Sequence, residues 1–338
     1  MHNSRHAPPL VTAIIPTFNR RSFLVKAIES ALAQTYENME VIVVDDGSVD
    51  GTDDSVAALG SRVRSLRYFK KRNGGCASAR NSGLDQASGE LLSFLDSDDT
   101  WLPSAIEGLV RTLRETGADL VYSPAIEIYP DGREVINYPV AAGRPRALAR
   151  EHFLATNVRT GSYLFTREAM QRAGRLDETL LHNEDSDYLQ RLAMHSRAAY
   201  SPLPTVRVYN HAGAKSRRRV EIYQALLRSS KRTLAQHPQF ARDLGPAAAG
   251  RLDQIRAQLI DALILAGEYR SAQQVANDVS GRLRLPAAAA ILIRRSFPLR
   301  VELALRELSH AAARAISRLG AGRFQERSAA DHQLVDGF

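Results

Sequence analysis

Three carboxylates lie within four residues at Asp96-Ser97-Asp98-Asp99, directly after the apolar run at residues 91–95. Like charges this close raise one another's pKa if they share a pocket. A divalent cation, held by one or two carboxylates together with substrate phosphates, would relieve the repulsion. The alternative is that the acids precede a helix beginning near Ser104, where the positive end of the helix dipole favours them. The residue types leave both interpretations open.

Two further groups of acids have a similar ambiguity. Asp45-Asp46-Gly47-Ser48 follows an apolar run, but Asp, Gly and Ser also dominate simple β-turns. Glu184, Asp185 and Asp187 follow Asn183, an arrangement typical of a helix N-terminus whether or not the acids do chemistry. Taken one at a time, neither group establishes a site.

The elements that must position these acids alternate between strands and helices. Apolar, β-branched runs predict strands at residues 10–15, 41–44, 63–69, 91–95 and 119–122. Apolar residues at helical spacing predict helices at residues 22–34, with Ser22 as N-cap, and at 52–59, 75–87 and 104–115. This alternation predicts an α/β fold with a mostly parallel sheet covered on both faces. Ligands of such sheets bind beyond the carboxyl ends of the strands, where the first two acidic groups fall.

The remainder of the chain is less regular and then becomes helical. Strands at residues 161–165 and 206–209, and a helix at 184–194, follow an irregular stretch at 129–150. Residues 259–275 resemble one tetratricopeptide-like hairpin, without any repeat. From residue 298 to 319 an apolar stripe faces a row of charged residues, mostly arginines, which predicts an amphipathic helix.

Six segments, in order along the chain, resemble the family 2 glycosyltransferases, which have the GT-A fold. They are VTAIIPTFNR at 11–20, EVIVVDDGSVDGT at 40–52, RNGGCASARNSGL at 72–84, ELLSFLDSDD at 90–99, TGSYLFTREAM at 160–170 and HNEDSDYLQRL at 182–192. The resemblance implies a GT-A catalytic domain at residues 10–215; from their composition we expect residues 1–9 to form a flexible tail and residues 216–338 a basic α-helical extension. One such motif would be weak evidence, but six in the same order are strong evidence.

On the donor side, the resemblance implies a nucleotide-sugar site. Pro16, Thr17 and Asn19 would cradle the nucleotide at the end of the first strand. Asp45 would accept a hydrogen bond from the base, and Arg72 would lie close to it.

The acidic cluster matches the family's DxD motif. Asp96 would face the ribose and Asp98 would hold a Mg²⁺ or Mn²⁺ ion, which neutralises the charge developing on the diphosphate leaving group. Asp99 could share the metal, because the run has one acid more than the minimal motif. His211 is a further candidate ligand for the metal, although a lone histidine is more often structural.

On the acceptor side, Asp185 matches the family's catalytic base. An acceptor hydroxyl is a poor nucleophile, so a carboxylate within hydrogen-bond reach must take its proton as it attacks. Glu184 would orient this base or touch the acceptor. Direct displacement with a single base inverts the anomeric centre, and inversion is what the resemblance implies.

Composition and charge limit where the protein works and with what. The single cysteine, Cys76, excludes an internal disulfide, which suits a reducing cytoplasm, and no signal peptide or membrane-spanning run is apparent. Residues 1–215 carry 25 Lys and Arg against 26 Asp and Glu, whereas residues 216–338 carry 20 against 11. The basic extension therefore suggests peripheral attachment to the anionic inner face of a membrane, or simply solvated helix faces.

Other functional classes fit less well. No G-x-G-x-x-G follows the first strand and no P-loop motif occurs, which disfavours a dehydrogenase and excludes a P-loop kinase. The basic extension has few aromatic residues among its arginines, so we expect no nucleic-acid partner. The expected partners are a nucleotide-sugar donor and a glycan or lipid-linked acceptor of cell-surface glycan synthesis. The rival hypothesis is a catalytically silent scaffold that binds nucleotide sugars.

Overall fold

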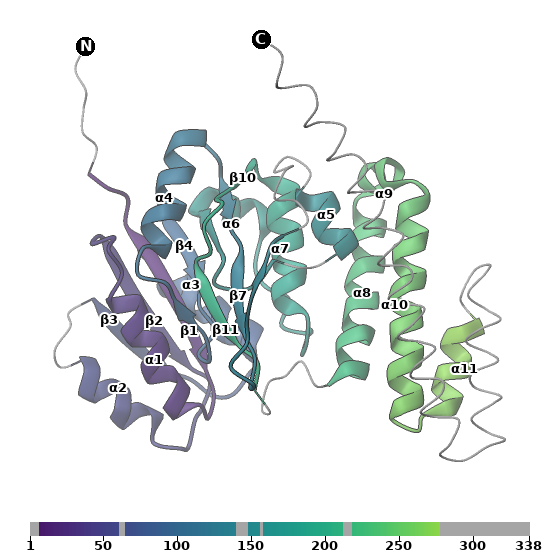
Figure 1. Ribbon diagram of the computed structural model, residues 1–338, viewed down its shortest axis with the longest axis horizontal. Helices are drawn as coiled ribbons and strands as arrows, with labels where there is room; N and C mark the ends of the chain where they lie inside the picture. Colours follow the sequence, from purple (N-terminus) through teal and green to yellow (C-terminus); the bar gives the residue numbers. More distant parts are fainter. Residues whose placement is uncertain (1–6, 61–64, 140–147, 156–157, 212–217, 278–338) are drawn as a thin grey trace, which may run out of the picture. The chain divides into compact units, whose positions relative to one another are not determined.

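A seven-stranded sheet forms the centre of the first compact unit in the computed structural model (Figure 1). The structure describes residues 7–60, 65–139, 148–155, 158–211 and 218–277, and the chain divides into the units Met1–Leu252 and Asp253–Phe338. The strand order is β10-β6-β9-β4-β1-β2-β3. The strands are β1 (Val11–Thr17), β2 (Met39–Asp45), β3 (Leu66–Lys70), β4 (Leu91–Phe94), β6 (Leu120–Tyr122), β9 (Tyr163–Thr166) and β10 (Ala198–Tyr200). Only the two pairings made by β9 are antiparallel, so the predicted α/β fold with a mostly parallel sheet is confirmed.

Helices cover both faces of this sheet because side chains alternate along each strand. In β1, Ala13 and Ile15 belong to one apolar cluster and Ile14 to the other. The first cluster contains residues of α1 (Arg21–Leu32) and α4 (Ala105–Thr116). The second contains residues of α3 (Cys76–Gln86), α5 (Leu148–Ala155), α6 (Arg167–Ala173) and α7 (Glu184–His195). The second face therefore brings α3 and α7 to the same part of the sheet.

Small residues let α3 approach the sheet closely. A Cβ added to Gly83 would lie 2.3 Å from Ile14 Cγ2 of β1, which no larger residue could accept without movement. Ala77 and Ala79 are also buried on this helix. Close packing of α3 places its remaining long side chains against the strand ends.

The cap expected for α1 is wrong, whereas the expected start of α4 near Ser104 is confirmed. Helix α1 begins at Arg21 with Arg20 at the N-cap position, so Ser22 lies in the first turn and is no cap. The acids from Asp96 to Asp99 do not precede a helix directly, since α4 begins at residue 105 after the N-cap Ser104. At the start of α1 the N–H of Arg21 donates to Asp50 Oδ2, a contact from a distant loop that no local capping preference predicts.

A second, four-stranded sheet has the order β5-β11-β7-β8 and was not predicted. Its strands are β5 (Thr100–Trp101), β11 (Val206–Tyr209), β7 (Ala125–Ile128) and β8 (Glu134–Asn137). Each has only two to four residues, too few to show a clear alternation. Of these only β11 was expected, and β8 lies in the stretch expected to be irregular. The sheet joins the segment after the acidic cluster to the segment before residue 210.

The first unit also contains α2 (Thr52–Gly60), α8 (Arg219–Gln236) and α9 (Pro238–Leu244), while α10 (Pro246–Leu265) crosses into the second unit and α11 (Tyr269–Asn277) lies within it. The helical character expected after residue 219 is confirmed over residues 219–277, and Gly267, with φ of 79°, lies between α10 and α11. In the part of the chain that the structure describes, no helix combines the length and apolarity needed to cross a bilayer. The amphipathic helix expected at residues 298–319 lies outside the described residues.

Candidate active site

The loops after β1 and β2 are joined at one edge of the main sheet. Thr17 pairs with Asp45 across the two strands. Beyond them, the backbone N–H of Asn19 donates to Ser48 Oγ at 2.8 Å, and Asn19 Oδ1 accepts from the N–H of Val49 at 2.9 Å. Asn19 has φ of 50°, a conformation that asparagine tolerates better than most residues. The predicted donor-side residues therefore lie on two loops that are hydrogen-bonded to each other. We call these two loops, together with the strand ends that carry them, the rim.

The buried residues of this rim differ in whether their side-chain oxygens already have hydrogen-bond partners. Pro16 is buried in β1, beside Val44 of β2. Thr17 is 4% exposed, and its Oγ1 has no hydrogen-bond partner among the described residues. Asp45 is fully buried: Oδ1 accepts from the N–H of Ser48 at 2.7 Å and Oδ2 from the Tyr68 hydroxyl at 2.5 Å. Asp45 thus already has two protein donors.

The neighbouring acid, Asp46, shapes the loop before α3. Its carboxylate accepts from the backbone N–H groups of Gly74 and Gly75 at 2.9 and 2.7 Å and pairs with Lys71 Nζ at 3.0 Å. Arg72, in the same loop, is exposed. Asp46 therefore fixes the loop that contains Arg72, and this loop lies close to the rim.

Arg80 is the residue that joins the two groups of candidate acids, and sequence analysis missed it. Its side chain is 2% exposed; Nη2 donates to Asp96 Oδ1 at 2.6 Å and Nη1 to Glu184 Oε1 at 3.2 Å. Arg80 lies three residues after Ala77 and four before Leu84, both buried, so it occupies the apolar face of α3. A charged residue on such a face was the signal that could have identified it.

Asp98 has two basic neighbours. It forms an ion pair with Arg20 Nη1, and His211 Nε2 lies 2.9 Å from Asp98 Oδ2. The ring of His211 also stacks on Phe23, with centroids 4.8 Å apart. The structure therefore brings together Asp98 and His211, two of the predicted metal ligands. In the described residues, no three His, Cys, Asp or Glu side chains are arranged to hold a metal by themselves.

Asp99, the third predicted ligand, is oriented by the second sheet. It is 5% exposed, and its Oδ1 accepts from the backbone N–H of Tyr209 in β11 at 3.1 Å. Burial, and then the charges of Asp96 and Asp98, raise its pKa well above the usual range. This hydrogen bond connects the acidic cluster to β11 through Asp99. That Asp99 binds a metal stays a prediction.

The predicted base and its neighbour have different environments. Glu184 is buried and paired with Arg80. Asp185 is half-buried; its Oδ2 accepts from Thr160 Oγ1 at 3.2 Å and its Oδ1 from the N–H of Ser186 at 2.8 Å. Neither hydrogen bond to Asp185 comes from a cation, so it is not neutralised by a partner as Glu184 is.

The acids act on one another electrostatically. The pKa of Asp96 is raised by withdrawal from water and by the charges of Asp98 and Asp185, while Arg80 opposes the rise. The charges of Asp98 and Asp185 thus both act on Asp96, which Arg80 contacts directly.

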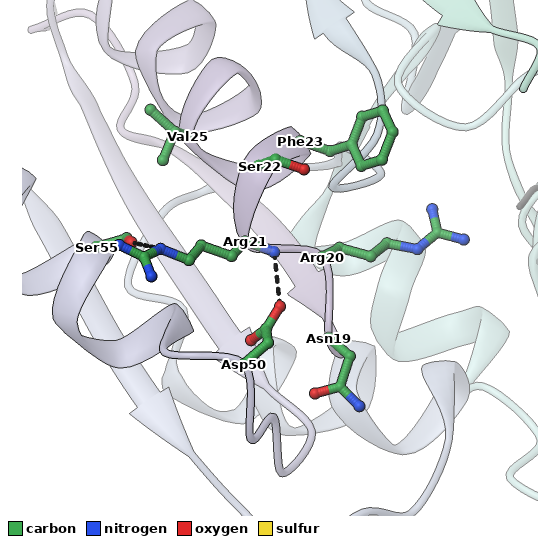
Figure 2. A pocket seen from close by; sticks show the side chains of 8 residues that line it. All are labelled: Asn19, Arg20, Arg21, Ser22, Phe23, Val25, Asp50 and Ser55. Atoms are coloured by element: carbon green, nitrogen blue, oxygen red, sulfur yellow. Dashed lines mark hydrogen bonds between the residues drawn. The ribbon is translucent and has the colours of Figure 1, made fainter.

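A cavity of about 440 Å³ lies beside Arg20 (Figure 2). It is lined by Asn19, Arg20, Arg21, Ser22, Phe23, Val25, Asp50 and Ser55. Figure 2 shows the Arg20 and Arg21 side chains extending in opposite directions, with Arg21 bonded to Ser55 and, through its backbone N–H, to Asp50. None of the acids from Asp96 to Asp99 lines the cavity, which adjoins them through Arg20, the partner of Asp98, and through Phe23, which stacks on His211.

Comparisons with known proteins give a family match and several glycosyltransferase relatives. Residues 12–171 match the family described as "Glycosyl transferase family 2". An uncharacterized glycosyltransferase of Rickettsia felis is 48% identical over 107 residues, covering 32% of this chain and 18% of that protein. The GalNAc(5)-diNAcBac-PP-undecaprenol beta-1,3-glucosyltransferase of Campylobacter jejuni is 40% identical over 121 residues, covering 35% of this chain and 39% of that protein. The chain thus spans less than two fifths of the length of either relative.

Two solved structures have a similar fold. TarS 1-349 of S. aureus, in complex with UDP-GlcNAc, has a TM-score of 0.59 and 19% identity over 83% of this chain and 88% of that one. The mannosyltransferase PcManGT of Pyrobaculum calidifontis, in complex with GDP-Man and Mn²⁺, has a TM-score of 0.56 and 21% identity over 91% and 86% of the two chains. At these identities the likeness shows the fold, which is of the GT-A type.

Proposed function

Because the chain belongs to glycosyl transferase family 2 through residues 12–171, we propose that it transfers a sugar from a nucleotide-diphosphate donor to an acceptor hydroxyl. The observation that carries the proposal is Arg80, whose guanidinium joins Asp96 of the DxD cluster to Glu184 beside Asp185. A donor-side acid and the candidate base are thereby held at one centre, as a transfer reaction requires.

The donor lies along the rim formed after β1 and β2. The unpartnered, buried Thr17 Oγ1 and the exposed Arg72 offer a hydroxyl and a cation to a nucleotide diphosphate, with Pro16 and Asn19 shaping the backbone between them. Two proteins of the same fold were solved with UDP-GlcNAc and with GDP-Man, which supports a nucleotide sugar as donor. Asp45 can accept from the base while it keeps the hydrogen bonds from Ser48 and Tyr68, because each carboxylate oxygen has a second lone pair, but the base must reach a fully buried group.

The residues present fit a divalent cation. Asp98 and His211 supply a carboxylate oxygen and an imidazole nitrogen; Mn²⁺ accepts both donors and Mg²⁺ the carboxylate, when diphosphate oxygens complete the set. The crowding that raises the pKa of Asp96 is also what a bound cation would relieve. When bound, the metal supplies Lewis-acid stabilisation of the departing diphosphate. Asp99 can join this set through Oδ2, because the Tyr209 N–H is bonded to its Oδ1.

Asp185 takes the acceptor proton. Thr160 and the Ser186 N–H orient its carboxylate without neutralising it, so it can accept the hydroxyl proton as the acceptor oxygen attacks. The new bond forms at the anomeric carbon while the bond to the diphosphate breaks. With a single base on the acceptor side, this displacement inverts the anomeric centre. Glu184, paired with Arg80, orients the neighbouring turn.

The acceptor and the site of action extend the proposal. A glycan or a lipid-linked sugar suits the family, and one relative is named as acting on an undecaprenol-linked glycan. We place the reaction in the cytoplasm, in cell-surface glycan synthesis, with the extension after residue 216 at an anionic membrane surface.

Donor turnover tests the proposal. The purified chain, with Mn²⁺ and a panel of nucleotide sugars, should slowly hydrolyse one donor and release nucleoside diphosphate. Asp185→Asn should lower transfer by a factor of about 10² or more and leave donor affinity unchanged, with Asp131→Asn, an exposed acid outside the site, as control. Tight binding of one donor without turnover by the wild type, with any acceptor offered, would favour the scaffold hypothesis.

A further inference from the structure

Helix α8 contacts the turn that precedes the candidate base. Asn183 Nδ2 donates to Ser229 Oγ of α8 at 3.1 Å. Arg232 of α8 donates from Nη2 to Asp187 Oδ1 at 2.7 Å, and its Nη1 forms an ion pair with Asp177. All of these residues belong to the unit Met1–Leu252.

The contacts to Asn183 and Asp187 fall at the N-cap and in the first turn of α7, which carries Asp185, whereas Asp177 precedes the helix. Asn183 is the N-cap residue of α7, but it has φ of 64° and its side chain makes no cap hydrogen bond within the helix. Its side-chain amide is used on Ser229 instead. The turn that aims Asp185 is therefore fixed from outside α7.

Asp187 shows that the contact with α8 is more than a surface ion pair. Its side chain is 2% exposed, and its two oxygens have separate cationic partners, Arg232 on Oδ1 and Arg191 on Oδ2. A buried carboxylate that loses one of two cations leaves an oxygen without a donor, which the turn can relieve only by moving toward water. Asp187 lies two residues after Asp185, so that movement would displace the base.

We propose that α8 is a positioning element of the active site, in which Arg232 and Ser229 hold the first turn of α7 so that Asp185 meets the acceptor. The inference rests on the proposed function, because it takes Asp185 as the base. It assigns to the segment after residue 216 a part in catalysis that the six motifs do not contain. A displacement of about 1 Å at a reacting group can cost on the order of 10²-fold in rate.

The test compares Arg232→Met with Arg228→Met in the full-length chain. Arg228 is an exposed residue of the same helix and serves as the matched control. Arg232→Met should lower kcat by about tenfold to a hundredfold, with donor KM unchanged, and should speed amide hydrogen exchange in the first turn of α7. Arg232→Lys should restore part of the rate, Ser229→Ala should show a smaller loss, and Arg228→Met should behave as the wild type.

Two results would overturn the proposal. One is a kcat of Arg232→Met, per folded molecule, equal to that of the wild type. The other is a loss of rate without faster exchange in α7, since the base would then be disturbed by another route. A wild-type chain that turns over no donor would instead reject the proposed function, while the exchange measurement would still report whether Arg232 holds the turn.

Discussion

At the scale of single residues, the site is organised by cations that compensate its acids. Arg80 forms ion pairs with Asp96 and Glu184, and Arg20 forms an ion pair with Asp98. A residue that compensates a buried charge is as necessary as the charge itself, because an unpaired carboxylate in a dry site becomes neutral or moves. Substitutions of these partners therefore reveal what the acids do.

Arg20 is predicted to compete with a divalent cation for Asp98. Because both side chains are about four-fifths buried, the ion pair is worth about 1 kcal/mol, and removing it should tighten Mn²⁺ binding roughly fivefold. Free Mn²⁺ measured by electron paramagnetic resonance, without nucleotide, compares the wild type with Arg20→Met. Arg21→Met is the control, since Arg21 contacts Ser55 instead. Unchanged or weaker Mn²⁺ binding by Arg20→Met would show that the metal does not use Asp98.

His152 predicts a loss of stability in acid. It is 2% exposed, its Nε2 lies 3.1 Å from the Ser186 carbonyl oxygen, and burial lowers its pKa to about 4. The folded protein therefore resists protonation that the unfolded chain accepts below pH 6.5, so stability is full above that pH and falls as the pH drops toward 4. At pH 4.5 the loss should be about 2.5 kcal/mol.

Urea unfolding at pH 7 and pH 4.5 checks this prediction. His152→Gln keeps a donor for the Ser186 carbonyl but cannot take up a proton, so its stability should depend less on pH by about 2.5 kcal/mol. Equal pH dependence of the two proteins would show that His152 titrates normally.

At the scale of elements, the site depends on how closely α3 packs on the sheet. Arg80 reaches both acids because Gly83 lets the helix lie against Ile14 of β1. The first turn of α7 approaches from the same face, and its candidate base then lies near the strand ends. The spacing between helix and sheet is thus part of the active-site geometry.

Gly83→Ala should destabilise the fold and weaken catalysis together. The added Cβ would lie 2.3 Å from Ile14 Cγ2, and overpacking of this kind costs about 1 to 3 kcal/mol. Gly108, in the middle of α4, has no atom within 4 Å of an added Cβ, so Gly108→Ala should instead stabilise by about 0.5 to 1 kcal/mol. Thermal and urea unfolding of both variants distinguish overpacking at residue 83 from stabilisation of the helix at residue 108. A Gly83→Ala variant as stable as the wild type would contradict the close approach of α3 to β1.

At the scale of the whole molecule, the charge is divided unequally. Residues 216–338 carry a net charge of +9, while residues 1–215 are close to neutral. Helix α8 uses one of these basic residues, Arg232, inside the catalytic unit.

Peripheral membrane attachment is predicted for the basic extension. Each Lys or Arg near an anionic membrane contributes about 1 kcal/mol at moderate salt, so replacing Arg300, Arg306, Arg314 and Arg318 by Gln should lower binding at least tenfold. Flotation with vesicles containing phosphatidylserine measures this in the full-length chain, and neutral vesicles are the control. Equal flotation of the wild type and the variant would remove the membrane hypothesis.

The sequence by itself determined the alternation of strands and helices and the placing of acids where strands end. Both follow from local periodicity, because a strand repeats every two residues and an α-helix every 3.6. Apart from β11, the strands of the second sheet were not predicted, because runs of two to four residues show almost no periodicity. The cap expected at Ser22 was wrong, because Asp50, 29 residues away, accepts from the N–H of Arg21 and fixes where the helix starts.

Only the tertiary structure decided which partners the acids have. Arg80 and Glu184 are separated by 104 residues, and Asp99 and Tyr209 by 110. Such pairs depend on how closely a helix packs and on which short strands align, and no local pattern encodes either quantity. The residue types that suit the chemistry can therefore be recognised in the sequence. Their cationic partners, their orientation and the helix that supports them are determined only when distant segments pack together.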